Sequence, residues 1–410
     1  MELKKLLVAG ISAAMMTGLV ACGGSSSNSN QTSNSRVVTG AITAFGSVYV
    51  NGVKYETDNA NVYIEGGAAS ESDLRVGMMV SVRTADGSSA ESIHHADDVE
   101  GFVIANNIAV DGTLNVMGQT VTVDSSTVFE SHVAGVGAPA DIAVGNIVEV
   151  TGSSDGMGSV LATRLEVKAV DLATYLVDHP NGVEVKGIVT DHNAIDKTFK
   201  IGALVVNYTD AILDDLPNGV VDGLYVEAKS TENLNASNQL VAYKVELESD
   251  GVKGEHGEDD EVEVHGEVSA ASASSVTVNG ISFVIDANTV YEHGVAADLV
   301  VGAIVEVEGH SNAEGVLIAS KVEFEEEENE LELRGNVSSV SADEANNGSI
   351  VLEGITLIVN SNTIMQDDSS AALTAFNLSL LSAGDYVKVH YVDNGDGTFT
   401  ATKIERKDPS

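Results

Sequence analysis

Glutamate and histidine recur together at one position of the sequence pattern. Glu130-Ser131-His132 and Glu292-His293 each follow a short run of β-branched and aromatic residues. Carboxylate and imidazole groups held at one structural position could bind a metal such as zinc. A polar loop at the rim of a β-structure would give the same pattern. The loop interpretation is favoured, because the equivalent segment near Glu65 has no histidine and the usual zinc spacing is absent from the sequence.

The other reactive patterns that would indicate an enzyme do not occur in this sequence. It contains no HExxH pair and no Walker-type loop. DNGDGT at 393–398 resembles a calcium loop, but Val392 falls at the first ligand position and no glutamate follows at the twelfth. A β-hairpin turn is favoured there. We therefore expect no catalytic residue, no cofactor and no metal site, and a protein that is not an enzyme.

Cys22 is the only cysteine of the chain and follows a signal-like leader. Lys4 and Lys5 precede an apolar run that is too short for a comfortable membrane span. The segment Leu19-Val20-Ala21-Cys22 resembles the lipobox of bacterial lipoproteins. The resemblance implies cleavage before Cys22 and acylation of its sulfur, which would anchor the chain to a membrane. Gly23 follows, and by resemblance to enterobacterial sorting this favours the outer membrane of the cell envelope.

The elements that must position any functional group belong to a unit repeated about five times. Residues 262–324 are the best-defined copy. Strands are expected at 262–268, 275–278, 281–285, 304–307 and 317–324, where apolar and polar residues alternate or β-branched residues cluster. Asn279-Gly280 predicts a type I′ hairpin turn, because both residues tolerate positive φ. An Asx-type turn is expected at 286–289.

Glycines and short motifs recur in register through the copies. A glycine inside the first strand fits a sharply coiled barrel strand. The strand glycines are Gly40, Gly101, Gly187, Gly266 and Gly335, and the hairpin glycines are Gly52, Gly118, Gly202, Gly280 and Gly354. The segment after the third strand varies most, and at 367–384 of the last copy it is predicted to form a short helix with Asp or Ser caps.

We therefore predict an all-β tandem array of about five small five-stranded barrels of the OB type, with small β-sandwiches as the alternative. A short helix is expected in the connector 169–182, between the second and third units. The predicted segments are a signal peptide (1–21), the lipidated Cys22 with a Ser/Asn/Gly tether (22–35), repeat 1 (36–98), repeat 2 (99–168), the connector (169–182), repeat 3 (183–247), an acidic linker (248–261), repeat 4 (262–324), a second acidic linker (325–330) and repeat 5 (331–407).

Charge and composition narrow the range of partners. The net charge is −42, only 4% of residues are aromatic, and tryptophan is absent. Such a surface repels phosphate backbones and lacks the aromatic side chains that stack on bases, so no nucleic-acid partner is expected. Acidic loops could bind divalent cations weakly. With so few aromatic residues, the barrel cores must consist of valine, isoleucine, leucine and alanine.

The lipobox, the tether and the repeated G-x-V, VNG, NT-V-Y, DL-x-VG-xx-V-E-V and A-x-KVE segments resemble bacterial lipoproteins built from tandem small-barrel domains of unknown function. The resemblance covers nearly all of 36–407 and implies no catalytic activity. We expect a non-enzymatic, membrane-anchored envelope protein that acts as a spacer or as a docking module for an envelope or extracellular protein. The alternatives are a divalent-cation-binding surface protein and an unrecognised envelope hydrolase.

Overall fold

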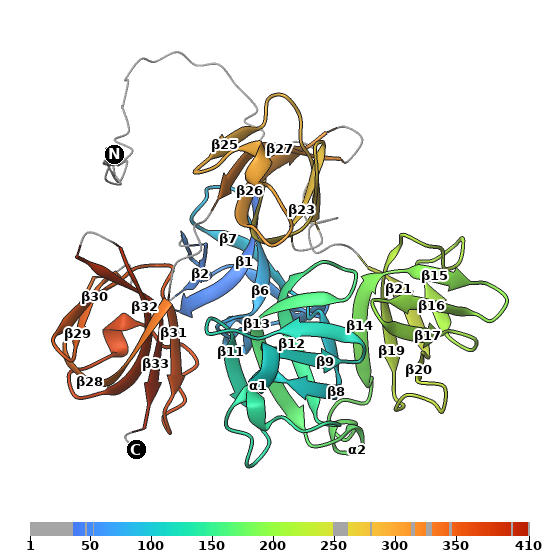
Figure 1. Ribbon diagram of the computed structural model, residues 1–410, viewed down its shortest axis with the longest axis horizontal. Helices are drawn as coiled ribbons and strands as arrows, with labels where there is room; N and C mark the ends of the chain where they lie inside the picture. The colour runs from blue at the N-terminus through green and yellow to red at the C-terminus, as the bar shows by residue number, and fades with distance from the viewer. Residues whose placement is uncertain are drawn as a thin grey trace, which may run out of the picture. The chain divides into compact units, whose positions relative to one another are not determined.

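The computed structural model contains five small β-barrels (Figure 1). It describes residues 36–45, 47–51, 53–248, 261–278, 281–312, 316–324, 330–343, 347–394 and 397–408. The predicted signal peptide, Cys22 and the tether lie outside the described residues, as do most of the two acidic linkers. None of the described helices is long and apolar enough to cross a membrane.

The first three barrels lie between Arg36 and Leu247. Barrel 1 has the strands β1 (Arg36–Phe45), β2 (Val48–Val50), β3 (Val53–Tyr55), β4 (Asn61–Ile64), β5 (Gly67–Ala69), β6 (Met79–Thr84) and β7 (Ala90–His95). Barrel 2 has β8 (Val99–Asn107), β9 (Thr113–Val116), β10 (Gln119–Thr122), β11 (Val128–Ser131), β12 (Ile147–Ser154) and β13 (Ser159–Ala169), with helix α1 (Ile108–Asp111) in its first hairpin. Barrel 3 has β14 (Val183–Ile188), β15 (Thr190–Asn193), β16 (Thr198–Ile201), β17 (Leu204–Asn207), β18 (Ile212–Asp214), β19 (Tyr225–Ser230), β20 (Gln239–Val241) and β21 (Lys244–Leu247).

The last two barrels have six strands each. Barrel 4 has β22 (Glu261–Ser272), β23 (Ser275–Val278), β24 (Ile281–Val284), β25 (Val290–Glu292), β26 (Ile304–Ser311) and β27 (Leu317–Phe324). Barrel 5 has β28 (Glu330–Ala342), β29 (Gly348–Leu352), β30 (Ile355–Val359), β31 (Ile364–Asp368), β32 (Tyr386–Asp393) and β33 (Phe399–Lys407). The strands expected in the best-defined copy are confirmed, and its first strand continues beyond Val268 to Ser272.

Each barrel closes on itself by the same order of pairing, which confirms the predicted OB-like barrel over the sandwich. In barrel 2, β8 pairs with β9, β9 with β10, β10 in parallel with β13, β13 with β12, and β12 with β8. Barrel 4 repeats this with β22, β23, β24, β27 and β26. Closure leaves no sheet edge along most of each strand, which protects the barrel from pairing with other chains.

The predicted helix between the third and fourth strands of the last copy is wrong. Residues expected to begin it belong to β31, where Asp367 forms an ion pair with Arg406 and accepts a hydrogen bond from the backbone N–H of Leu373. One turn of 3-10 helix, η4 (Leu378–Leu380), is the only helical element described in this insertion, and Asn377 caps it. Single 3-10 turns stand at the same place in three other barrels, at η1 (Glu71–Asp73), η2 (Pro139–Asp141) and η3 (Ala296–Asp298).

The repeated strand glycine also makes room for a side chain, which the sequence did not predict. A methyl group at Gly40 would overlap the side chain of Asn51, and one at Gly101 would overlap Met117. Both covering residues occupy the first turn position of the hairpin, so the hairpin lays one side chain across the first strand. A β-bulge two residues further on, as at Val103/Ala105, bends the strand locally.

Two predicted turns are confirmed. Met117-Gly118 has positive φ at both residues, +46° and +85°, as a type I′ turn requires. Asn279-Gly280 lies outside the described residues. In the Asx turn at 286–289, Asn288 N donates to Asp286 Oδ1 at 2.7 Å, and Thr289 Oγ1 donates to the carbonyl of Ala319 in the last strand at 2.9 Å. The same threonine bond occurs from Thr127 to Ala162 and from Thr363 to Ala401, so this turn is fastened to the last strand in three barrels.

The cores contain mainly valine, isoleucine and leucine, as the composition predicts. Barrels 2 and 3 share one core, to which helix α2 (Leu172–Tyr175) contributes the buried residues Leu172 and Tyr175. This helix confirms the one predicted in the connector, and Asp171 caps it by accepting a hydrogen bond from Thr174 N at 2.8 Å. Because the connector helix and both barrels contribute to this shared core, the two neighbouring barrels pack as one body.

The first half of each barrel's first strand is not paired with the barrel's own hairpin. One side of its backbone can therefore pair with a strand of another barrel. In barrels 2 and 3 these halves pair with each other: β8 runs antiparallel to β14, with Val99 opposite Val185. In barrels 1 and 4 they also pair, with Arg36 to Thr39 of β1 parallel to Glu261 to Val264 of β22. Strand pairing thus continues from one barrel into another.

Candidate functional site

The predicted Glu/His positions make polar contacts with the last strand of their own barrel. His132 Nε2 lies 2.9 Å from Glu166 Oε1, and the Arg164 guanidinium contacts both Glu130 and Glu166. In barrel 4, His293 Nδ1 lies 3.2 Å from Glu323 Oε1. Glu166 and Glu323 occupy the same place in the A-x-K/R-apolar-Glu segment. These contacts support the interpretation as a polar rim.

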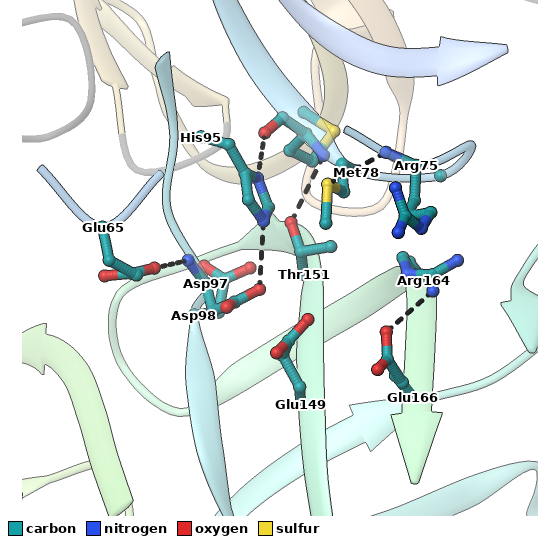
Figure 2. Close-up of polar contacts among 12 residues, drawn as sticks. Glu65, Arg75, Met78, His95, Asp97, Asp98, Glu149, Thr151, Arg164 and Glu166 are labelled. Atoms are coloured by element: carbon teal, nitrogen blue, oxygen red, sulfur yellow. Dashed lines mark hydrogen bonds and ion pairs between the residues drawn. The ribbon is translucent and has the colours of Figure 1, made fainter. Parts of the chain in front are cut away.

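The structure brings together a different set of charged residues, where barrels 1, 2 and 3 meet. Figure 2 shows four of them, Glu65, His95, Asp97 and Asp98. Glu65 follows β4, His95 ends β7, Asp97 and Asp98 connect barrels 1 and 2, and Lys186 lies on β14. We call these five residues the junction cluster. None of these five residues is among the site residues predicted from the sequence.

His95 is the buried centre of the cluster, with its side chain closed off from solvent. Its Nδ1 lies 2.7 Å from the backbone carbonyl oxygen of Met79, and its Nε2 lies 3.3 Å from Asp97 Oδ1. A carbonyl oxygen can only accept, so Nδ1 must carry a proton. Without a second proton, Nε2 and the Asp97 carboxylate would direct two lone pairs at each other. The geometry therefore favours the imidazolium form.

The electrostatics of the pair agree with its geometry. Burial by itself would lower the pKa of His95, but the Asp97 carboxylate and the Met79 carbonyl outweigh burial and raise the pKa to about 9. Burial raises the pKa of Asp97 to about 7, with repulsion from Glu149 adding to the effect and His95 opposing it. Both groups hold a proton more tightly than they would in water.

Asp98 fastens barrel 1 to barrel 2 and to barrel 3. Its backbone N–H donates to the Val150 carbonyl at 3.0 Å, its Oδ2 accepts from Gly152 N at 2.8 Å, and its carbonyl accepts from Lys186 N at 3.1 Å. Burial raises the pKa of Asp98 to about 7, against the opposing effects of Gly152 N–H and the Lys186 ammonium. The three-residue link between barrels 1 and 2 is thus held by hydrogen bonds from both sides.

Lys186 lies in the middle of three carboxylates from two barrels. Its Nζ is 2.7 Å from Glu65 Oε2 in barrel 1, and 3.8 Å and 3.6 Å from Glu184 and Glu227 in barrel 3. Oxygens of these three glutamates lie within 4.8 Å of one another, close enough to hold a metal ion. The lysine ammonium already provides the positive charge at that place, and the carboxylates hold the pKa of Lys186 well above its usual value despite complete burial.

Glutamates also stand side by side across the sheet next to the cluster. Glu166, Glu149, Glu100 and Glu184 are directly opposite one another on β13, β12, β8 and β14. Lys168 bridges Glu149 and Glu166 at 2.8 Å and 3.0 Å. Glu100 instead bonds to the Tyr175 hydroxyl, and burial together with repulsion from Glu149 raises its pKa to about 8. Neutral Glu100 removes one negative charge from the row.

A polar cavity of about 340 Å³ opens beside this row. Its lining includes His95, Asp97, Glu100, Glu149 and Lys168. Chemically, such a lining can bind and exchange protons or hold a small cation. The five residues come from four strands and one connecting segment, so sequence spacing gives no sign of the site. The one signal available was charged residues at alternate positions of strands that are otherwise buried.

The predicted hairpin at 393–398 is confirmed, because β32 and β33 pair antiparallel up to Asp393 and Phe399 and Asn394 N donates to the Thr398 carbonyl at 3.1 Å. Gly395 and Asp396 lie outside the described residues. No group of three or more described residues with ligand spacing includes this turn.

Comparison with known proteins identifies the repeats. A family model described as a domain of unknown function, DUF5666, matches residues 37–90, 100–166, 265–323 and 334–405, together more than half of the chain. These segments fall on barrels 1, 2, 4 and 5. Barrel 3 is not among them, although its strands pair in the same order; its first and last strands are each interrupted, at Val189 and at Ala242-Tyr243.

Among solved structures, five chains match. One is titled "drosophila Unr CSD456"; it is 14% identical, and the match covers 55% of this chain and 97% of that chain with a TM-score of 0.14. No curated protein matches the chain.

Proposed function

Because the chain belongs to the DUF5666 family, a domain whose function is unknown, we propose that it is a non-enzymatic, lipid-anchored protein of the bacterial cell envelope. Its barrels act together as a spacer and as a docking surface for an envelope or extracellular protein. Support for the anchor comes from the lipobox-like segment ending in Cys22. Several acyl chains on that residue would make a stable membrane attachment.

The spacer proposal rests on the position of Lys186 between two barrels. Its ammonium joins Glu65 of barrel 1 to Glu184 and Glu227 of barrel 3, and the shared backbone pairing of β8 with β14 adds to this connection. Buried charges are costly unless they are paired, so a chain that buries them between domains gains a specific arrangement of those domains. Barrels held in one arrangement maintain a distance from the membrane that freely jointed barrels would not.

Divalent-cation binding is the weaker alternative. The two trios of carboxylates with suitable spacing in the described chain share Glu227, which Lys229 contacts at 2.9 Å. Lysine ammonium groups therefore supply the charge that a cation would bring. The acidic linkers, which first suggested this function, lie mostly outside the described residues.

Two measurements test the proposal. Labelling of cells with an alkynyl fatty acid should mark the wild-type chain and leave Cys22→Ala unmarked, and only the wild type should sediment with outer-membrane fragments. A mature form that keeps its leader and an unmodified sulfur would contradict the anchor. Pull-down from detergent-solubilised envelopes should then enrich a protein partner, with chains neutralised in the acidic linkers as the matched control. Absence of any enriched partner, together with normal envelopes after deletion, would contradict the docking role.

A further inference from the structure

Four of the five barrels use the same part of their first strand to join another barrel. The first halves of β8 and β14 pair with each other, and those of β1 and β22 do the same. In each case the second half of the strand is occupied by the barrel's own hairpin. The free backbone side of the first half is therefore an established interface in this fold.

Barrel 5 leaves the equivalent edge open. Glu330 to Asn336 of β28 pair with β32 on one side, and β29 begins to pair only at Val337. No strand among the described residues lies along the other side of this segment. Leu331 is 45% exposed, and the side chains of Glu332 and Arg334 are 41% and 59% exposed. An unpaired edge with an exposed leucine is a ready template for another strand.

The pairing of β8 with β14 supplies the register. Val99 lies two residues before Gly101, Val185 lies two residues before Gly187, and these two valines face each other. The pair is thus centred on equivalent positions of two related strands, as in a two-fold interface. The residue two before Gly335 is Leu333. In the same register, Leu333 faces Leu333 of a second copy, and Glu332 faces Arg334 of a second copy, twice.

The charges along the open edge of β28 favour a second copy of this chain as the strand that pairs with it. With a net charge of −42, most surfaces of two copies repel each other. The open edge is an exception, because Arg334 and Glu332 alternate along it and already bond to each other within one chain, Nε to Oε1, at 2.7 Å. In the antiparallel pair, each Arg334 stands directly opposite a glutamate of the other copy, which stabilises a cross-strand pair.

We propose that two copies of this chain associate through β28, antiparallel and with Leu333 at the two-fold axis. A closed two-fold pair uses up the open edge and leaves none for further growth. The inference does not depend on the lipid anchor, because the edge belongs to barrel 5 and the proposed acylation site is Cys22.

Cysteine cross-linking tests the register directly. Full-length chains carrying Glu332→Cys and Arg334→Cys are co-expressed with different tags, and oxidised disulfide-linked dimers are collected. Directly opposite residues in an antiparallel pair have Cα atoms about 5 Å apart, within disulfide range, whereas equal positions lie on a diagonal about 7–8 Å apart, outside it. We expect the mixed pair to cross-link and either variant alone to give no more dimer than the wild type, which controls for Cys22. Equal cross-linking of Glu332→Cys with itself would overturn the register.

A charge exchange separates pairing from folding. By light scattering of the purified full chain in detergent, Arg334→Glu and Glu332→Arg should each weaken dimerisation about tenfold, because each places like charges opposite one another. The double variant Glu332→Arg/Arg334→Glu restores opposite charges and should dimerise like the wild type. Circular dichroism identifies any variant that fails to fold. A wild type that stays monomeric at all concentrations would overturn the proposal, as would equal association of all four chains.

Discussion

His95 and Asp97 face each other across 3.3 Å inside the junction, with Nδ1 of the histidine held as a donor by the Met79 carbonyl. Neither side chain is open to solvent, so the environment that holds the proton between them exists only in the folded protein. A buried pair that binds protons more tightly than the unfolded chain makes stability depend on pH.

The first prediction is that stability falls as the solution becomes alkaline. The pKa of His95 is raised from 6.5 to about 9 and that of Asp97 from 3.8 to about 7. Both shifts are upward, so the folded protein binds more protons than the unfolded chain between about pH 4 and pH 9. The stabilisation by His95 is fully present below pH 6.5 and is lost as pH rises through 9, with an upper limit of about 3 kcal/mol.

Differential scanning calorimetry from pH 5 to pH 9 measures this effect. Glu65, Glu149 and Lys186 also face the pair and remain unchanged in the variants. His95→Gln should flatten the fall in Tm above pH 6.5. A variant whose Tm follows the wild-type curve in parallel would show that other groups carry the pH dependence.

The second prediction concerns the lysine among three carboxylates. Lys186→Met leaves Glu65, Glu184 and Glu227 close together without their shared cation, and the loss of one partner from a buried ion pair costs about 3–5 kcal/mol. Lys200→Met is the matched control, since Lys200 and Asp191 form an exposed pair worth less than about 1 kcal/mol. Denaturant unfolding gives both values.

Calcium provides a further readout for the same site. Oxygens of the three glutamates lie within 4.8 Å of one another, so the Lys186→Met chain should gain thermal stability on addition of millimolar calcium. The wild type should gain less. If calcium raises the Tm of both chains equally, the ion acts elsewhere on the acidic surface.

The third prediction tests the close contact of two strands at Gly152. A methyl group there would collide with the backbone carbonyl oxygen of Leu161 on the adjoining strand, and backbone cannot move aside as a flexible side chain can. Gly152→Ala should therefore destabilise barrel 2 by about 1–3 kcal/mol in denaturant unfolding. Gly137→Ala is the control, because its nearest neighbour would be Asp141 Oδ2 at 3.9 Å. Equal stability of the two variants would disprove this account of the glycine.

Local patterns were sufficient to predict each barrel. Ser275–Val278 is a strand because its side chains alternate between core and surface, and the turn at Met117-Gly118 has the positive φ values that hairpin glycines permit. The helix expected at 367–384 failed for a tertiary reason: Asp367 is bound by Arg406, almost forty residues later. The contact that covers Gly40 was also not predicted, because the covering residue, Asn51, lies in a hairpin turn later in the chain.

What the sequence by itself determined is therefore the repeated barrel and its strand register, since alternation, turn chemistry and β-branched content act over a few neighbouring residues. Only the tertiary structure decided which charges meet. Glu65, His95, Asp97 and Lys186 are spread over more than a hundred residues and come together because the ends of three barrels converge. Pairing of that kind depends on distance in space, and that distance is decided by how whole barrels pack.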